Sequence, residues 1–77
     1  MVLKKKITES KETLANNLAR LRLERQTSLE HLSFETKLEL KTIQKIQEGK
    51  ANPSLKEITK LATALEVPIH ELLSTKK

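Results

Sequence analysis

Residues 27–49 read TSLEHLSFETKLELKTIQKIQEG, and the spacing within this stretch decides the fold. Its inward-facing positions recur at helical intervals in two groups with a single leucine between them. They are Leu32, Ser33, Leu38, Ile43 and Ile46. The pattern predicts two short helices that share one core, joined by a turn at residues 37–39. The later helix of this pair, about residues 40–47, stops before Gly49, a residue suited to a left-handed C-cap. The stretch therefore predicts a helix-turn-helix.

The rest of the chain is also helical in its spacing, and no segment alternates like a strand. Leucines at 14, 18 and 21 predict an amphipathic helix over about residues 11–25. Ser54 and Glu57 form a capping box that opens a fourth helix, which ends at residues 66–67. Pro68 precedes a short last helix over about residues 69–74. The expected core positions of the last two helices are Ile58, Leu61, Ala62, Leu65 and Leu72. We therefore predict an all-α domain of five helices.

The composition excludes several classes of site. The chain has 77 residues, with no cysteine, no aspartate, one glycine and one aromatic residue, Phe34. It therefore offers no disulfide, no thiolate metal site, no glycine-rich phosphate loop and no aromatic platform for single-stranded nucleic acid. No window approaches the length of a membrane span, and no signal peptide is evident. We expect a cytoplasmic protein that is not an enzyme and needs no cofactor, metal or small-molecule effector.

Positive charge is concentrated at the N-terminus of the chain. The net charge is +5. Residues 1–25 carry seven Lys or Arg against three Glu, whereas residues 26–50 carry four of each. Because residues 1–10 lack apolar periodicity, we expect a flexible basic arm, then the domain over residues 11–74 and a frayed tail at residues 75–77. The arm either holds phosphates through counterion release or is a solvated terminus.

The helix at about residues 40–47 leaves polar side chains outside the core. At this spacing lysine can reach guanine and glutamine can reach adenine in the major groove of duplex DNA. A solvated helix face would show the same pattern, so the spacing alone does not choose between the two interpretations.

Three further features carry a resemblance to a known family. They are Ser28 followed by Leu32-Ser33, the pair Ile43 and Ile46 before Gly49-Lys50, and Asn52-Pro53-Ser54-Leu55 leading into LATALEVP. From Leu14 to Leu73 the chain resembles the lambda-repressor-like (Xre, or Cro/cI-type) helix-turn-helix family. That resemblance implies a five-helix DNA-binding domain whose third helix enters the major groove of double-stranded DNA, usually as a homodimer on a pseudo-palindromic site.

The resemblance also implies roles for individual positions. The base-reading candidates are Leu40, Lys41, Thr42, Gln44 and Lys45. The phosphate-contacting candidates are Arg22, Ser28, Leu29, Lys37, Lys50 and Asn52. The fifth helix commonly supplies the dimer contact, which makes Ile69 and Leu73 candidates, whereas core burial is favoured for Leu72.

The chain departs from the family pattern at four positions. Leu29 replaces a frequent Gln, and an apolar Leu40 opens the recognition helix. Lys37 stands where a turn glycine is usual, so it must adopt a left-handed backbone or shift the turn. Gln47 replaces a Glu that often pairs with the Arg matched by Arg22. Because an amide is a weaker partner than a carboxylate, we expect Arg22 to be freer to turn toward a phosphate.

Two functions fit these observations. The first is a homodimeric transcription regulator of prokaryotic or phage origin: a restriction–modification controller, a phage-type repressor or an antitoxin. The alternative is a protein-interaction module that uses the helix-turn-helix face, suggested by Leu29, Leu40 and the neutral charge of residues 26–50.

Overall fold

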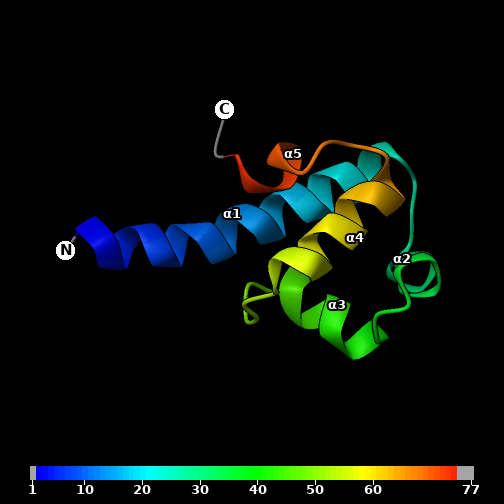
Figure 1. Ribbon diagram of the computed structural model, residues 1–77, viewed down its shortest axis with the longest axis horizontal. Coiled ribbons are helices and arrows are strands. Elements are labelled where there is room, and N and C mark those ends of the chain that lie inside the picture. Colours follow the sequence, from blue (N-terminus) through cyan, green and yellow to red (C-terminus); the bar gives the residue numbers. More distant parts are fainter. Residues whose placement is uncertain (1, 75–77) are drawn as a thin grey trace.

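The computed structural model describes residues 2–74, and the side chains of residues 11–74. Over the residues described, the chain forms five helices and no strand (Figure 1). The helices are α1 (Val2–Glu24), α2 (Leu29–Thr36), α3 (Leu40–Gln47), α4 (Leu55–Leu65) and α5 (His70–Leu73). None of the described helices is long and apolar enough to cross a membrane. The predicted all-α, five-helix fold is confirmed.

The first helix begins much earlier than its apolar stripe. We predicted a start near residue 11, but α1 begins at Val2, and its N-terminal half projects beyond the other helices (Figure 1). The prediction was wrong because an apolar stripe reports burial, whereas Lys, Glu and Leu favour a helix without being buried. The side chains of the predicted arm at residues 1–10, like the tail at residues 75–77, lie outside the described residues.

Local signals set the beginnings of α2 and α4. The Ser28 side chain accepts a hydrogen bond from the backbone N–H of His31, which makes Ser28 the N-cap of α2. At α4, Ser54 accepts from the Glu57 N–H, and the Glu57 carboxylate accepts from the Ser54 N–H. Each cap satisfies a backbone N–H that has no partner inside its own helix. The predicted capping box of α4 is confirmed.

One core joins all five helices. Its fully buried side chains, each less than 2% exposed, are Leu18, Leu32, Ile43, Ile46, Leu61, Leu65 and Leu72. α1 packs against α3 and α5, while α2 packs against α3 and α4, so the helix-turn-helix is held from both sides. Burial of these side chains is the main term that stabilises a domain of this size.

Candidate nucleic-acid interface

The turn between α2 and α3 is fixed by a left-handed residue and two hydroxyl groups. Lys37 has φ 64° and ψ 20°, and its N–H donates to the Ser33 carbonyl at 2.9 Å. The Ser33 hydroxyl donates to the Leu38 carbonyl at 2.6 Å. The hydroxyl of Thr36, a buried residue, donates to the Leu32 carbonyl and accepts from the Leu38 N–H. These bonds set the angle between the two helices. Of the two alternatives for Lys37, a left-handed backbone or a shifted turn, the structure has the first. The role of Thr36 was not predicted.

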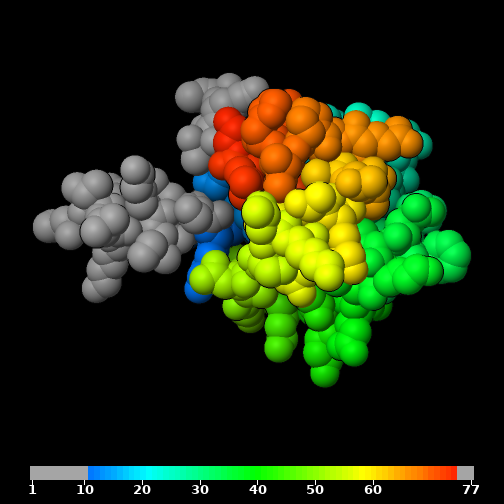
Figure 2. Space-filling view, in the orientation of Figure 1, coloured from blue at the N-terminus to red at the C-terminus, as the bar shows by residue number. Residues whose placement is uncertain are grey.

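The outer face of α3 carries a stripe of exposed polar side chains. They lie at helical spacing and are Lys41, Gln44, Lys45 and Glu48. The opposite face is anchored by Ile43 and Ile46, which are 0% and 1% exposed. Leu40 and Thr42 are half-buried at the two edges of the stripe. Side chains of α3 project from the lower edge of the molecule in Figure 2. A helix backed by the core therefore presents two amines, an amide and a carboxylate to one side.

Further candidates flank α3. Figure 1 shows α3 between α2 on one side and the loop that leads to α4 on the other. Ser28 is exposed at the N-terminus of α2, and Lys50 and Asn52 are exposed in the loop. The Lys50 Nζ lies 3.7 Å from a carboxylate oxygen of Glu48, an ion pair that was not predicted. Leu29 is half-buried, and its side chain packs against the core of the domain and not outward toward a partner.

Arg22 is held by a side-chain amide and a backbone carbonyl. Its Nε donates to the Gln47 Oε1 at 3.2 Å, and one terminal nitrogen donates to the Thr27 carbonyl, also at 3.2 Å. Gln47 in turn donates to the Ala15 carbonyl at 3.5 Å. The amide thus replaces the family's carboxylate as a partner of Arg22. The expectation that this uncharged partner leaves Arg22 freer to turn toward a phosphate stays a prediction.

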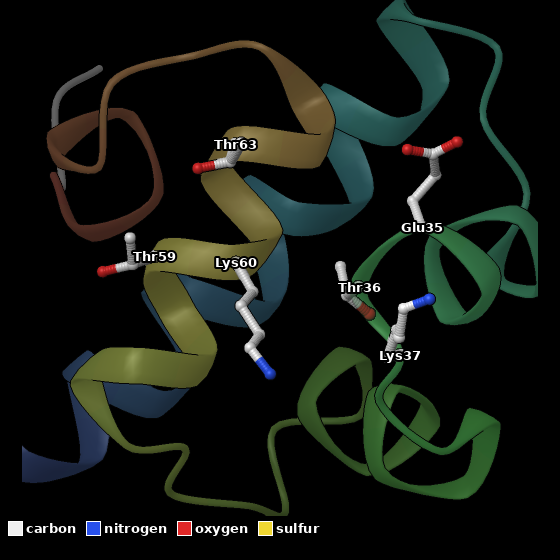
Figure 3. A pocket seen from close by; sticks show the side chains of 6 residues that line it. All are labelled: Glu35, Thr36, Lys37, Thr59, Lys60 and Thr63. Carbon is white, nitrogen blue, oxygen red and sulfur yellow. The ribbon is translucent and has the colours of Figure 1, made fainter.

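Lys37 lies apart from the other phosphate candidates. It lines an open depression of about 370 Å³ between α2 and α4, together with Lys60, Thr59 and Thr63 of α4 (Figure 3). Glu35 and Thr36 complete the lining. The structure therefore groups Lys37 with Lys60, and not with Lys50 or the α3 stripe.

The one-turn helix α5 and the residue before it carry the two dimer candidates, beside a buried leucine. Leu72 is fully buried, as predicted, and Leu73 is 47% exposed. Ile69 is half-buried and packs against the core. Leu73, with the exposed part of Ile69, therefore forms a small apolar surface next to α1.

Comparison with known proteins gives two findings. Residues 17–77 match the model of the Cro/C1-type HTH DNA-binding domain. The chain is also similar to the crystal structure of the restriction-modification controller protein C.AhdI from Aeromonas hydrophila. That similarity has 35% sequence identity and a TM-score of 0.75, and covers 78% of this chain and 91% of that one. No curated protein matches the chain.

Proposed function

Because the chain belongs to the Cro/C1-type helix-turn-helix DNA-binding family, we propose that it is a homodimeric, sequence-specific transcription regulator. This family consists of DNA-binding regulators and is not a family of enzymes. The observation that carries the proposal is the α3 stripe, which is exposed, rigidly backed and flanked on both sides by phosphate-binding candidates. An α-helix with this arrangement fits the major groove of B-DNA, with positioning contacts to the backbone on either side.

We assign base reading mainly to Lys41, Gln44 and Lys45, with Leu40 and Thr42 at the edges of the contact. The lysine amines suit the O6 and N7 acceptors of guanine, and the Gln44 amide suits adenine. The half-buried Leu40 can pack on a thymine methyl group. Lys50, Asn52 and the N-terminus of α2 at Ser28 and Leu29 would hold phosphates, the last through free backbone N–H groups.

The arrangement of the site favours a dimer. One α3 reads only a few base pairs, so a small domain of this kind gains affinity and specificity by pairing two half-sites one helical turn apart. We place the contact at Leu73 of α5 and at Ile69, the residue just before that helix. The similarity to C.AhdI, over 91% of that chain, favours a restriction–modification controller over a phage-type repressor or an antitoxin. Such a regulator would act in the cytoplasm of a prokaryote.

Selection of bound sequences from a random duplex pool tests the proposal. The expected result is a two-fold site whose half-site centres lie about 10 base pairs apart. Affinity for the selected site and for random DNA would then be measured at several salt concentrations. If no duplex binds better than a neutral polymer at low salt, the chain is not a DNA-binding regulator.

Alanine variants separate base contacts from phosphate contacts. Lys41→Ala and Lys45→Ala should weaken binding to the selected site by about 1–3 kcal/mol each and leave random DNA less affected. Lys60→Ala is the matched control, because this lysine of α4 is equally exposed and is not one of the DNA-contact candidates. Equal losses on both kinds of DNA for Lys41 and Lys45 would contradict their assignment as base readers.

The structure removes one of the observations that supported the alternative function, a protein-interaction module. Leu29 packs against the core, and neither Leu29 nor Leu40 is among the strongly exposed apolar residues. The alternative now depends on Leu40 and on the neutral charge of residues 26–50. It would be favoured only by the absence of duplex binding in the experiment above.

A further inference from the structure

A buried asparagine on α1 holds the C-terminal end of α5. Asn17 is 9% exposed, and its Nδ2 donates to the Leu72 carbonyl at 2.8 Å and to the Ser74 carbonyl at 2.9 Å. Its Oδ1 accepts from an Arg20 terminal nitrogen at 3.2 Å, which fixes the orientation of the amide. Both N–H bonds of the side-chain amide are therefore directed at α5.

α5 needs this support because it is very short. A helix of four residues does not form by itself. Fixing the backbone of its first turn costs more free energy than the hydrogen bonds of that single turn recover. The carbonyls of a last turn also lack partners within their own helix. Leu72 fixes one side chain of α5 in the core and Ile69 packs against the core just before the helix, but neither side chain gives the carbonyls at the C-terminal end a partner. The two bonds from Asn17 fix the direction in which the C-terminal end of α5 points.

We propose that Asn17 is a positioning residue for self-association, holding α5 so that Ile69 and Leu73 face a second copy of the chain together. This inference rests on the proposed dimer. Leu73 lies between the two residues whose carbonyls Asn17 binds, and Ile69 is the N-cap residue of the same short helix. Without the two bonds, α5 must be ordered when the subunits meet, and that ordering reduces the affinity of the association. Because a two-fold dimer contains two such helices, the loss is incurred twice.

The test compares the full chain with Asn17→Ala and with Asn16→Ala. Asn16 is the neighbouring residue on α1, identical in type but exposed, so its variant controls for the change in helix propensity. Sedimentation equilibrium gives the dimer dissociation constant, and amide hydrogen exchange reports the opening of α5. For Asn17→Ala we expect dimerisation at least about tenfold weaker, which is about 1.4 kcal/mol. We also expect faster exchange at the Leu72 and Ser74 amides, with α3 unchanged. Asn16→Ala should match the wild type.

Several outcomes would overturn the proposal. Dimerisation of wild-type strength in Asn17→Ala would do so, as would exchange that accelerates equally in α3 and α5, since that indicates a merely structural role. If Asn17→Ala does not fold, Asn17→Leu keeps the approximate volume of the side chain and removes both donors without adding a charge, and the same dimer loss is expected. A wild-type chain that stays monomeric contradicts the proposed dimer instead. The exchange measurement then decides by itself whether Asn17 holds α5.

Discussion

At the scale of single residues, three positions other than glycine adopt a left-handed backbone within residues 2–74. Gln26, Lys37 and Glu66 have φ of 52°, 64° and 60°, and each follows a helix. Side chains with a Cβ pay a steric cost in this region of about 1–2 kcal/mol relative to the right-handed conformation. Only Lys37 was anticipated, because its position in the turn pattern normally holds glycine. Nothing in the sequence near Gln26 or Glu66 signals a positive φ.

The strain at Lys37 gives a prediction for stability. Lys37→Gly should raise the free energy of unfolding by about 0.5–1 kcal/mol, because relief of the left-handed strain exceeds the entropy that glycine adds to the unfolded chain. In thermal unfolding followed by circular dichroism, this is a rise in Tm of about 2–8 °C for a domain of this size. Lys37→Ala is the control, since it removes the amine but keeps the Cβ. An equal rise in both variants would show that the charge of Lys37, and not its backbone, limits stability.

At the scale of helices, local signals were read correctly from the sequence and long-range ones were not. The bounds of α2, α3 and α4 follow from caps and apolar spacing, which are properties of neighbouring residues. The start of α1 was missed because no residue before Lys11 marks a boundary. The bonds of Asn17 to α5 were missed for another reason. They join residues 55 and 57 positions apart in the chain, and an isolated asparagine in a helical pattern gives no signal of a distant partner.

The cap of α4 gives a prediction at this scale. α4 carries Ile58, Leu61, Ala62 and Leu65 into the core, so loosening its first turn weakens the whole domain. Ser54→Ala removes the acceptor for the Glu57 N–H and should lower the free energy of unfolding by about 1 kcal/mol in chemical denaturation. Glu57→Gln keeps an acceptor for the Ser54 N–H and should cost much less. Equal losses in the two variants would assign the effect to the charge of Glu57 near the helix N-terminus.

At the scale of the whole molecule, the candidate site could be predicted in outline but not in its charge pairing. The exposed stripe of α3 followed from spacing alone. The partners of the charged residues did not, because an ion pair depends on how a loop folds back. Glu48 is the last exposed residue of the stripe, and its carboxylate forms an ion pair with Lys50. Part of the neutral net charge of residues 26–50 thus comes from a positive and a negative side chain that lie next to each other, Lys50 and Glu48.

This pairing leads to a prediction about DNA affinity as a function of salt. Both partners are exposed, so the pair contributes about 0–1 kcal/mol, and Glu48→Gln should leave stability unchanged. It should raise affinity for the selected site and for random DNA by a similar factor, about twofold to fivefold per protomer, because a phosphate no longer competes with a carboxylate for Lys50. Lys50→Ala should weaken binding to both kinds of DNA and lower the slope of log K against log salt concentration by about one.

The double variant, Glu48→Gln with Lys50→Ala, shows whether Glu48 acts through Lys50 or on the phosphates directly. If Glu48→Gln raises affinity as much without Lys50 as with it, Glu48 acts by repelling phosphates directly, and the ion pair does not restrain Lys50.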